Sequence, residues 1–167
     1  MMTIQIENSN QLRWQTDFER LLAPIRQQIE PLNWLITDLR YHFIDDKEPQ
    51  EIPAWDIEWG TERQFALVLG KELWESVANR DIQVVWGVFC GMIGEVPSIP
   101  DNELPYADGN KQMWTEPESF QLANSQIEII CWDSALTWIK FQNENLGAQF
   151  LLLFPEGKIL LNPDATV

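Results

Sequence analysis

The sequence is poor in the residues that build common catalytic and metal centres. It has one histidine, His42, and two cysteines, Cys90 and Cys131, that lie far apart in the chain. One histidine leaves a His-based zinc site short of ligands, and two isolated cysteines form neither a CxxC pair nor a disulfide framework. Both cysteines fall in apolar runs, so we expect buried thiols and neither a metal nor a cofactor.

Motifs for phosphate, nucleophile and calcium chemistry are also missing. The sequence has no glycine-rich phosphate cradle, no G-x-S-x-G elbow and no Asp-x-Asp-x-Asp-Gly loop. Residues 101–103 and 108–110 supply calcium-type ligands, but not at the spacing of an EF-hand. We therefore expect no enzymatic activity, with a pair of carboxylates acting on a glycoside as an open alternative.

Positive charge and long apolar runs are scarce as well. There are 11 Lys and Arg against 26 Asp and Glu, a formal net charge of −15. This balance argues against nucleic acid and anionic membranes as partners, because both recruit clustered cations. No apolar run is long enough to span a bilayer, and residues 1–10 lack the features of a secretory signal. The length suits a single domain over residues 1–167, which we expect in the cytoplasm.

Hydrophobic patterning predicts an α+β fold, with a mainly antiparallel sheet and two or three helices packed on one face. Short alternating or apolar runs are typical of strands. Residues 3–7 suggest an edge strand, residues 82–93 a central strand, and residues 133–135 a hairpin turn. The remaining strands are expected at residues 33–44, 127–132, 136–141 and 159–161.

Capping patterns and helical spacing predict the helices. Thr16 and Glu19 have the spacing of a capping box at the start of a helix that ends before Pro31. A second such box at residues 61–64 precedes a run with two interpretations. One is a continuous helix, and the other is a buried strand at 65–69 followed by a helix; we favour helix at least over 71–79. A last helix contains Leu146, Phe150, Leu153 and Phe154.

Acidic charge is concentrated in two predicted long loops. Residues 45–62 hold seven acids and one lysine, and residues 94–118 hold six acids and one lysine. The same loops contain aromatic residues, in a chain that has nine tryptophans. Aromatic anchors surrounded by carboxylates are typical of a surface that binds a basic protein. The candidate partner-binding residues are Trp55, Asp56, Glu58, Trp59, Asp101, Glu103, Tyr106, Asp108 and Trp114.

Other interpretations of these loops remain open. If residues 55–59 are extended, Trp55, Ile57 and Trp59 share one side of the strand. Trp55, Trp59 and Trp114 would then also suit a small-ligand or carbohydrate-binding module, in which they stack on sugar rings. The loops also fit a solvated surface in a protein without any ligand.

The C-terminal third resembles small bacterial proteins of uncharacterised families. The resemblance rests on the run Ile127 to Ser134, the strand from Leu136 to Phe141, and the later Phe150-x-x-x-Phe154-Pro155. Some of those proteins are encoded beside secreted or contact-delivered toxins and look like immunity proteins. The resemblance implies no catalytic residue. It implies a partner that is a toxin, and a nuclease-type toxin has the basic surface that an acidic inhibitor complements.

Overall fold

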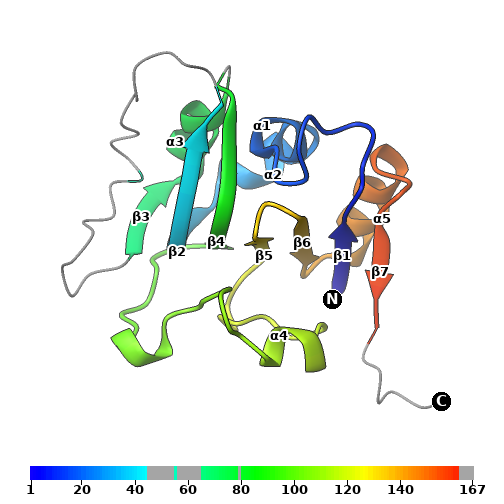
Figure 1. The fold of residues 1–167 in the computed structure, drawn as a ribbon. Helices are drawn as coiled ribbons and strands as arrows, with labels where there is room; N and C mark the ends of the chain where they lie inside the picture. The colour runs from blue at the N-terminus through cyan, green and yellow to red at the C-terminus, as the bar shows by residue number, and fades with distance from the viewer. Residues whose placement is uncertain (45–54, 56–64, 79, 162–167) are drawn as a thin grey trace.

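The computed structural model describes residues 1–44, 55, 65–78 and 80–161. The described strands form one antiparallel sheet in the order β3-β2-β4-β5-β6-β1-β7 (Figure 1). The predicted α+β fold is confirmed. The strands are β1 (Met2–Ile6), β2 (Asn33–Phe43), β3 (Phe65–Leu69), β4 (Ile82–Met92), β5 (Ile127–Trp132), β6 (Leu136–Phe141) and β7 (Lys158–Leu160). The helices are α1 (Phe18–Leu22), α2 (Arg26–Ile29), α3 (Gly70–Val77), α4 (Gln112–Thr115) and α5 (Glu144–Leu153), with 3-10 turns at Ala23–Ile25 and Asp101–Glu103.

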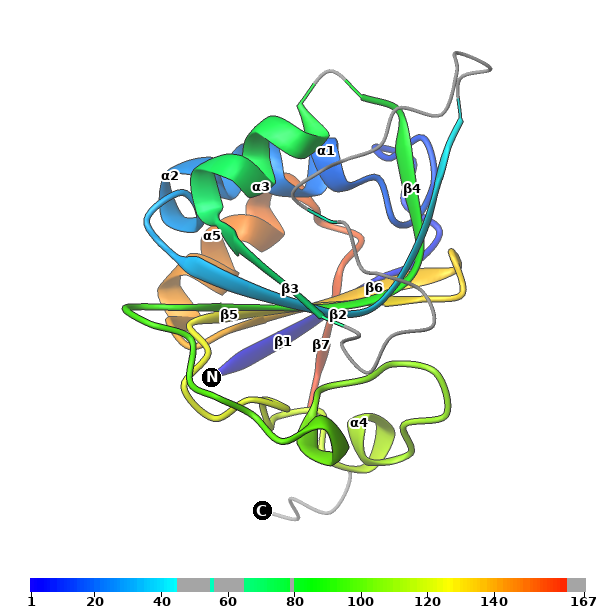
Figure 2. The same cartoon turned by 90° about the vertical axis from the view of Figure 1, so that its left-hand side faces the viewer.

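The two faces of the sheet are covered differently. Helices α1, α2, α3 and α5 lie on one face, whereas the long connection between β4 and β5, which contains α4, crosses the other (Figure 2). Each face has its own apolar core. The larger core lies under the helices and the smaller one under the connection. No helix in the described part of the chain is long and apolar enough to cross a membrane.

The first predicted helix is present, but its N-cap differs from the prediction. Asp17, not Thr16, caps α1, and its carboxylate accepts a hydrogen bond from the backbone N–H of Arg20. Arg13 Nε lies 2.7 Å from Asp17 Oδ2 and holds the carboxylate at the helix start. Thr16 Oγ1 is buried and has no hydrogen-bond partner in the described structure. Pro24 then divides the helix, because the chain makes a 3-10 turn between α1 and α2.

The ambiguous run after residue 64 is a strand followed by a helix. Residues 65–69 pair with β2, and α3 begins directly at Gly70. Gly70 N donates to Leu32 O at 2.8 Å, so the helix start is held against the preceding loop. A Cβ at Gly70 would lie 1.9 Å from Ile29 O, and only glycine fits this approach. The capping box expected at residues 61–64 lies outside the described residues.

Strand β1 is not at the edge of the sheet, contrary to the prediction. It pairs with β6 on one side and with β7 on the other. The alternation in residues 3–7 predicts one free edge, but the short strand β7 returns from the end of α5 and occupies it. Ile4 and Ile6 are consequently fully buried in the larger core.

The predicted hairpin between β5 and β6 is confirmed. Asp133 and Ser134 both have positive φ, 47° and 55°, as the two central residues of a type I′ turn require. This turn sets the register, which places Trp132 opposite Leu136 and Glu128 opposite Lys140.

Trp55 does not form part of an exposed surface. It is 1% exposed and packs in the larger core, with its ring 6.3 Å from Phe18, 5.5 Å from Tyr41 and 5.8 Å from Phe89 between centroids. Burial of its large apolar area outweighs the acidic character of its sequence neighbours. The prediction that Trp55 is a surface anchor for a partner is therefore wrong. Asp56, Glu58 and Trp59 lie outside the described residues.

Candidate functional site

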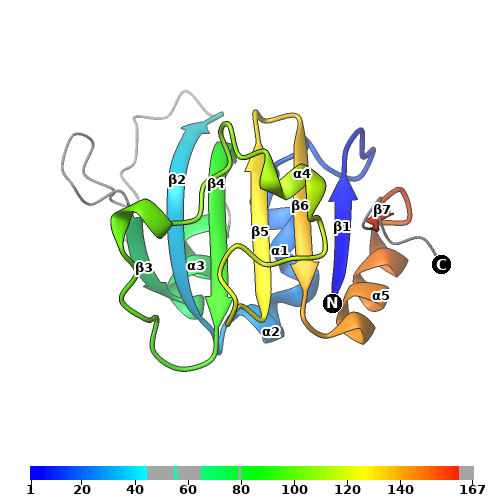
Figure 3. The same cartoon turned by 90° about the horizontal axis from the view of Figure 1, so that it is seen from below.

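Residues 94–126, called the cover segment from here on, form the second layer of the molecule. They cross the face of the sheet from β3 and β2 to β6, and α4 lies over the first part of β6 (Figure 3). As predicted for residues 94–118, the segment is mostly irregular, with only a 3-10 turn and α4 as regular structure. Its apolar side chains pack on the smaller core of the sheet; they are Val96, Ile99, Leu104, Ala107, Met113 and Leu122.

An acidic side chain of β2 anchors the middle of the cover segment. Asp38 has φ 50° and sits where the β2–β4 register shifts, between Thr37 and Arg40. This bulge turns the carboxylate toward the segment, where Oδ2 accepts hydrogen bonds from Ala107 N at 2.9 Å and Asp108 N at 3.0 Å. One side chain thus holds two consecutive backbone amides.

A buried ion pair anchors the end of the cover segment. Lys140 Nζ lies 2.8 Å from Glu128 Oε1, and both side chains are at most 1% exposed. Lys140 Nζ also donates to Ser119 O at 2.5 Å, and Glu128 Oε2 accepts from Gln121 N at 2.7 Å. Both charges therefore bind backbone groups of the segment as well as each other. Thr3 Oγ1 adds a hydrogen bond of 2.6 Å to Pro117 O.

The two cysteines are free and buried, as predicted. Burial raises the pKa of the Cys131 thiol well above its usual range. Burial also raises the pKa of the Cys90 thiol, and the nearby Glu128 carboxylate adds to that shift. Neither sulfur has the thiolate character that a reactive cysteine needs.

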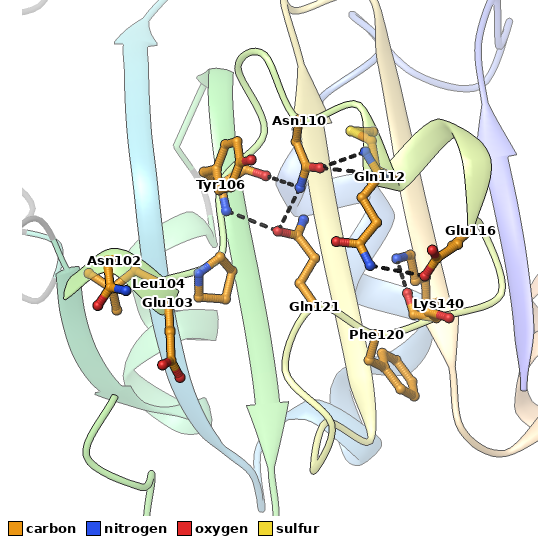
Figure 4. Close-up of a pocket in the computed structure, with 13 residues that line it drawn as sticks. Asn102, Glu103, Leu104, Tyr106, Asn110, Gln112, Glu116, Phe120, Gln121 and Lys140 are labelled. Carbon is orange, nitrogen blue, oxygen red and sulfur yellow. Dashed lines mark hydrogen bonds between the residues drawn. The ribbon is translucent and has the colours of Figure 1, made fainter. Parts of the chain in front are cut away.

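Hydrogen bonds within the cover segment also stabilise its shape. Gln121 Oε1 accepts hydrogen bonds from Tyr106 N and from Asn110 Nδ2, each at 3.0 Å. Asn110 Oδ1 accepts from Gln112 N at 3.0 Å and from Met113 N at 3.3 Å, which fixes the start of α4 (Figure 4). The segment has a defined shape despite its small content of regular structure.

The sequence-predicted residues of this region are all exposed on the cover segment. Tyr106 is 50% exposed and Trp114 42% exposed. The acidic residues predicted with them, Asp101, Glu103 and Asp108, are exposed too. Lys111 is the only lysine or arginine of the segment, against six acids.

Trp114 is held by other aromatic rings. Its ring centroid lies 5.2 Å from that of Trp132 and 4.8 Å from that of Trp138, both in edge-on geometry. Trp132 in turn contacts Trp86 at 4.8 Å. Trp138 is buried, and its Nε1 donates to Gln5 Oε1 at 2.9 Å. The partly exposed ring of Trp114 is therefore held in place by its contacts with Trp132 and Trp138.

Residues 102–121 surround a cavity of about 170 Å³ on the sheet-facing side of the segment. Asn102 and Glu103 lie on one side of it and Gln112 and Glu116 on the other, with Gln121 between them (Figure 4). The buried Lys140 lines its inner end. The other lining residues are Leu104, Pro105, Tyr106, Asn110, Met113, Ser119 and Phe120.

The buried pair and the cavity were not anticipated from the sequence. Hairpin pairing that matches Trp132 with Leu136 also matches Glu128 with Lys140, and each is a charge inside an apolar strand. That combination was a usable indication of a cross-strand ion pair.

No metal site is evident among residues 1–44, 55, 65–78 and 80–161, where no three His, Cys, Asp or Glu residues cluster suitably. Comparison with protein-family models, with curated proteins and with solved structures finds no match to this chain.

Proposed function

We propose that this chain is a non-enzymatic binding protein whose cover segment takes a basic protein partner. The contact surface is the outer side of the segment, formed by Asp101, Glu103, Tyr106, Asp108 and Trp114. The observation that carries the proposal is that two aromatic rings, Tyr106 and Trp114, are about half exposed on a segment with exposed carboxylates. Tyrosine and tryptophan are the residues most enriched at the centres of interfaces.

The anchoring of the segment supports the same function. Asp38, Glu128 and Lys140 hold its backbone from the sheet, and Trp132 and Trp138 hold the ring of Trp114. A surface that is ordered before binding loses less conformational entropy when the partner arrives. The excess of carboxylates would speed association with a basic partner and disfavour acidic ones.

The C-terminal resemblance suggests a more specific form of this function. An immunity protein in the cytoplasm of the producing cell would occupy the basic active-site surface of a nuclease-type toxin. An acidic segment with two aromatic anchors suits that surface, because it offers carboxylates where the toxin binds phosphates.

The test compares partner binding by wild type and by two variants. Asp101→Lys/Asp108→Lys reverses two exposed charges, and Trp114→Ala removes one aromatic anchor. The matched control, Glu75→Lys/Glu144→Lys, reverses two exposed charges on α3 and α5, on the opposite layer. The tagged proteins are immobilised and exposed to a lysate of producing cells, with and without the toxin-bearing neighbour strain.

We expect wild type and the control to retain one basic protein at low salt and to release it at high salt. The charge-reversed variant and Trp114→Ala should bind that protein at least about tenfold more weakly, since an anchor residue contributes about 2 kcal/mol or more. A partner that binds all four proteins equally, or that is acidic, would contradict the proposal.

A further inference from the structure

We infer that the open cavity between residues 102–121 and Lys140 of β6 binds a neutral polyhydroxylated molecule, a polyol or a single sugar ring. Its volume of about 170 Å³ far exceeds the roughly 10–15 Å³ that one water molecule requires. It shares Glu103 and Tyr106 with the proposed protein-binding surface, whereas Asp101, Asp108 and Trp114 do not line it.

Hydrogen-bond donors lie at the inner end of the cavity. Gln121 Nε2 is buried and has no hydrogen-bond partner in the part of the chain that the structure describes. The orientation of the Gln121 amide is fixed because its other atom, Oε1, accepts hydrogen bonds from Tyr106 N and Asn110 Nδ2. Lys140 Nζ is the second inner donor, and its charge is balanced by Glu128 at 2.8 Å. A buried donor without an acceptor is costly, so a ligand oxygen placed here would be stabilised.

Acceptors lie at the rim. Glu103 and Glu116 are both exposed, and Gln112 Nε2 donates to Glu116 Oε2 at 2.9 Å. An anion would be attracted by the inner donors but repelled by these two carboxylates. A cation would suit the rim but would place its own N–H groups against Gln121 Nε2 and Lys140 Nζ. A hydroxyl group donates and accepts at once, so a ligand with several hydroxyls satisfies both ends without carrying a charge.

The cavity also offers apolar contacts. Leu104, Pro105, Met113 and Phe120 line it, together with the ring of Tyr106. Such side chains pack on the C–H groups of a polyol or sugar ring, while the few polar groups fix its orientation. The mixture of apolar wall, inner donors and outer acceptors therefore indicates the ligand class.

The test is a titration of the full chain with myo-inositol, D-glucose and D-galactose, followed by calorimetry and by saturation-transfer NMR. Inorganic phosphate and lysine amide serve as anionic and cationic comparators. Ser119→Phe places a ring in the cavity, while the Ser119 carbonyl still accepts from Lys140. Ser98→Phe is the matched control, since Ser98 is an exposed serine of the same segment that does not line the cavity. Gln121→Leu removes one of the two inner donors, and its unfolding midpoint verifies that it folds.

We expect at least one of the three polyols to bind wild type and Ser98→Phe with a Kd of about the millimolar range, as suits so small a ligand. Ser119→Phe and folded Gln121→Leu should bind it at least about tenfold more weakly. The Asp101→Lys/Asp108→Lys and Trp114→Ala variants should bind it as wild type does, which separates this inference from the proposed function. The inference is overturned if no polyol binds up to about 100 mM, if Ser119→Phe binds equally well, or if phosphate or lysine amide binds more tightly.

Discussion

Glu128 and Lys140 face each other across β5 and β6 and form a buried ion pair against the cover segment. Each charge also bonds to a backbone group of that segment, Gln121 N or Ser119 O. The pair is therefore a joint between the two layers of the molecule, not only a contact between two strands.

Removing one member of this pair should be severely destabilising. Lys140→Met leaves the Glu128 carboxylate buried without a counter-charge, and we expect a loss of about 3–5 kcal/mol in the free energy of unfolding. The double variant Glu128→Gln/Lys140→Met should be more stable than Lys140→Met, because the amide removes the charge and keeps an oxygen for Gln121 N. Urea unfolding measures all three proteins.

The control for this experiment is an exposed pair. Lys71→Met removes the partner of Glu75 on the surface of α3, where both side chains are mostly exposed. We expect a change within about 0.5 kcal/mol. If Lys140→Met cost as little as Lys71→Met, the buried pair would not join the layers as described.

Asp38 should control the local stability of the cover segment. Asp38→Gly suits the φ of 50° but removes the acceptor of Ala107 N and Asp108 N. We expect amide hydrogen exchange at residues 107 and 108 to accelerate at least about tenfold, with little change at Phe89 in the core. Asp38→Asn keeps a side-chain oxygen and tolerates the positive φ, so its exchange should stay near that of wild type. Equal acceleration in both variants would contradict this role.

Two glycine-to-alanine changes should differ because their neighbours differ in rigidity. A Cβ at Gly70 meets the backbone oxygen of Ile29 at 1.9 Å, whereas a Cβ at Gly147 meets the flexible side chain of Met2 at 2.7 Å. We expect Gly70→Ala to cost about 2–3 kcal/mol and Gly147→Ala to be near neutral, since alanine also favours the helix. Thermal or urea unfolding compares them, and a Gly70→Ala protein as stable as wild type would rule out the close approach of α3 to Ile29.

Stability should fall in alkaline solution through the two buried thiols. Burial raises the pKa of Cys90 and of Cys131 above the value of about 8.5 in the unfolded chain. The folded state then keeps protons that the unfolded state releases, so this contribution is complete below about pH 8.5 and is lost as pH rises. The slope is at most about 1.4 kcal/mol per pH unit for each thiol.

The comparison protein is Cys90→Ala/Cys131→Ala, unfolded in urea under reducing conditions between about pH 8 and pH 10. Whatever its stability at neutral pH, its free energy of unfolding should decline less steeply with pH than that of wild type. Parallel declines would show that the thiols ionise equally in both states.

Local patterns predicted the parts of the fold that local rules determine. The apolar run of β4 and the hairpin of β5 and β6 follow from side-chain patterning and from a short turn at residues 133–135. The prolines and glycines of the cover segment predict its irregular structure. Its path was not predictable, because it is fixed by bonds between residues far apart in sequence, such as Asp38 with Ala107 and Thr3 with Pro117.

The sequence predicted some residues of the candidate site correctly and misplaced others. Tyr106 and Trp114 are exposed beside acids as the sequence suggested, but Trp55 is in the core although its sequence neighbours are just as acidic. Charge along the chain does not distinguish these tryptophans, because burial depends on where the sheet and α1 leave an apolar space. To predict the buried Glu128–Lys140 pair, one needs the register of β5 and β6, and this register follows from the position of the hairpin turn.

The position of β1 has a consequence for how the chain folds. Met2 pairs with Phe141 and Thr3 with Leu160, so the first strand has no neighbour in the sheet until the last third of the chain is present. During synthesis on the ribosome, β2, β3 and β4 are complete long before that point. Closing such distant contacts is slow, and until it happens the apolar face of β1 and one edge of β6 stay open to wrong pairings.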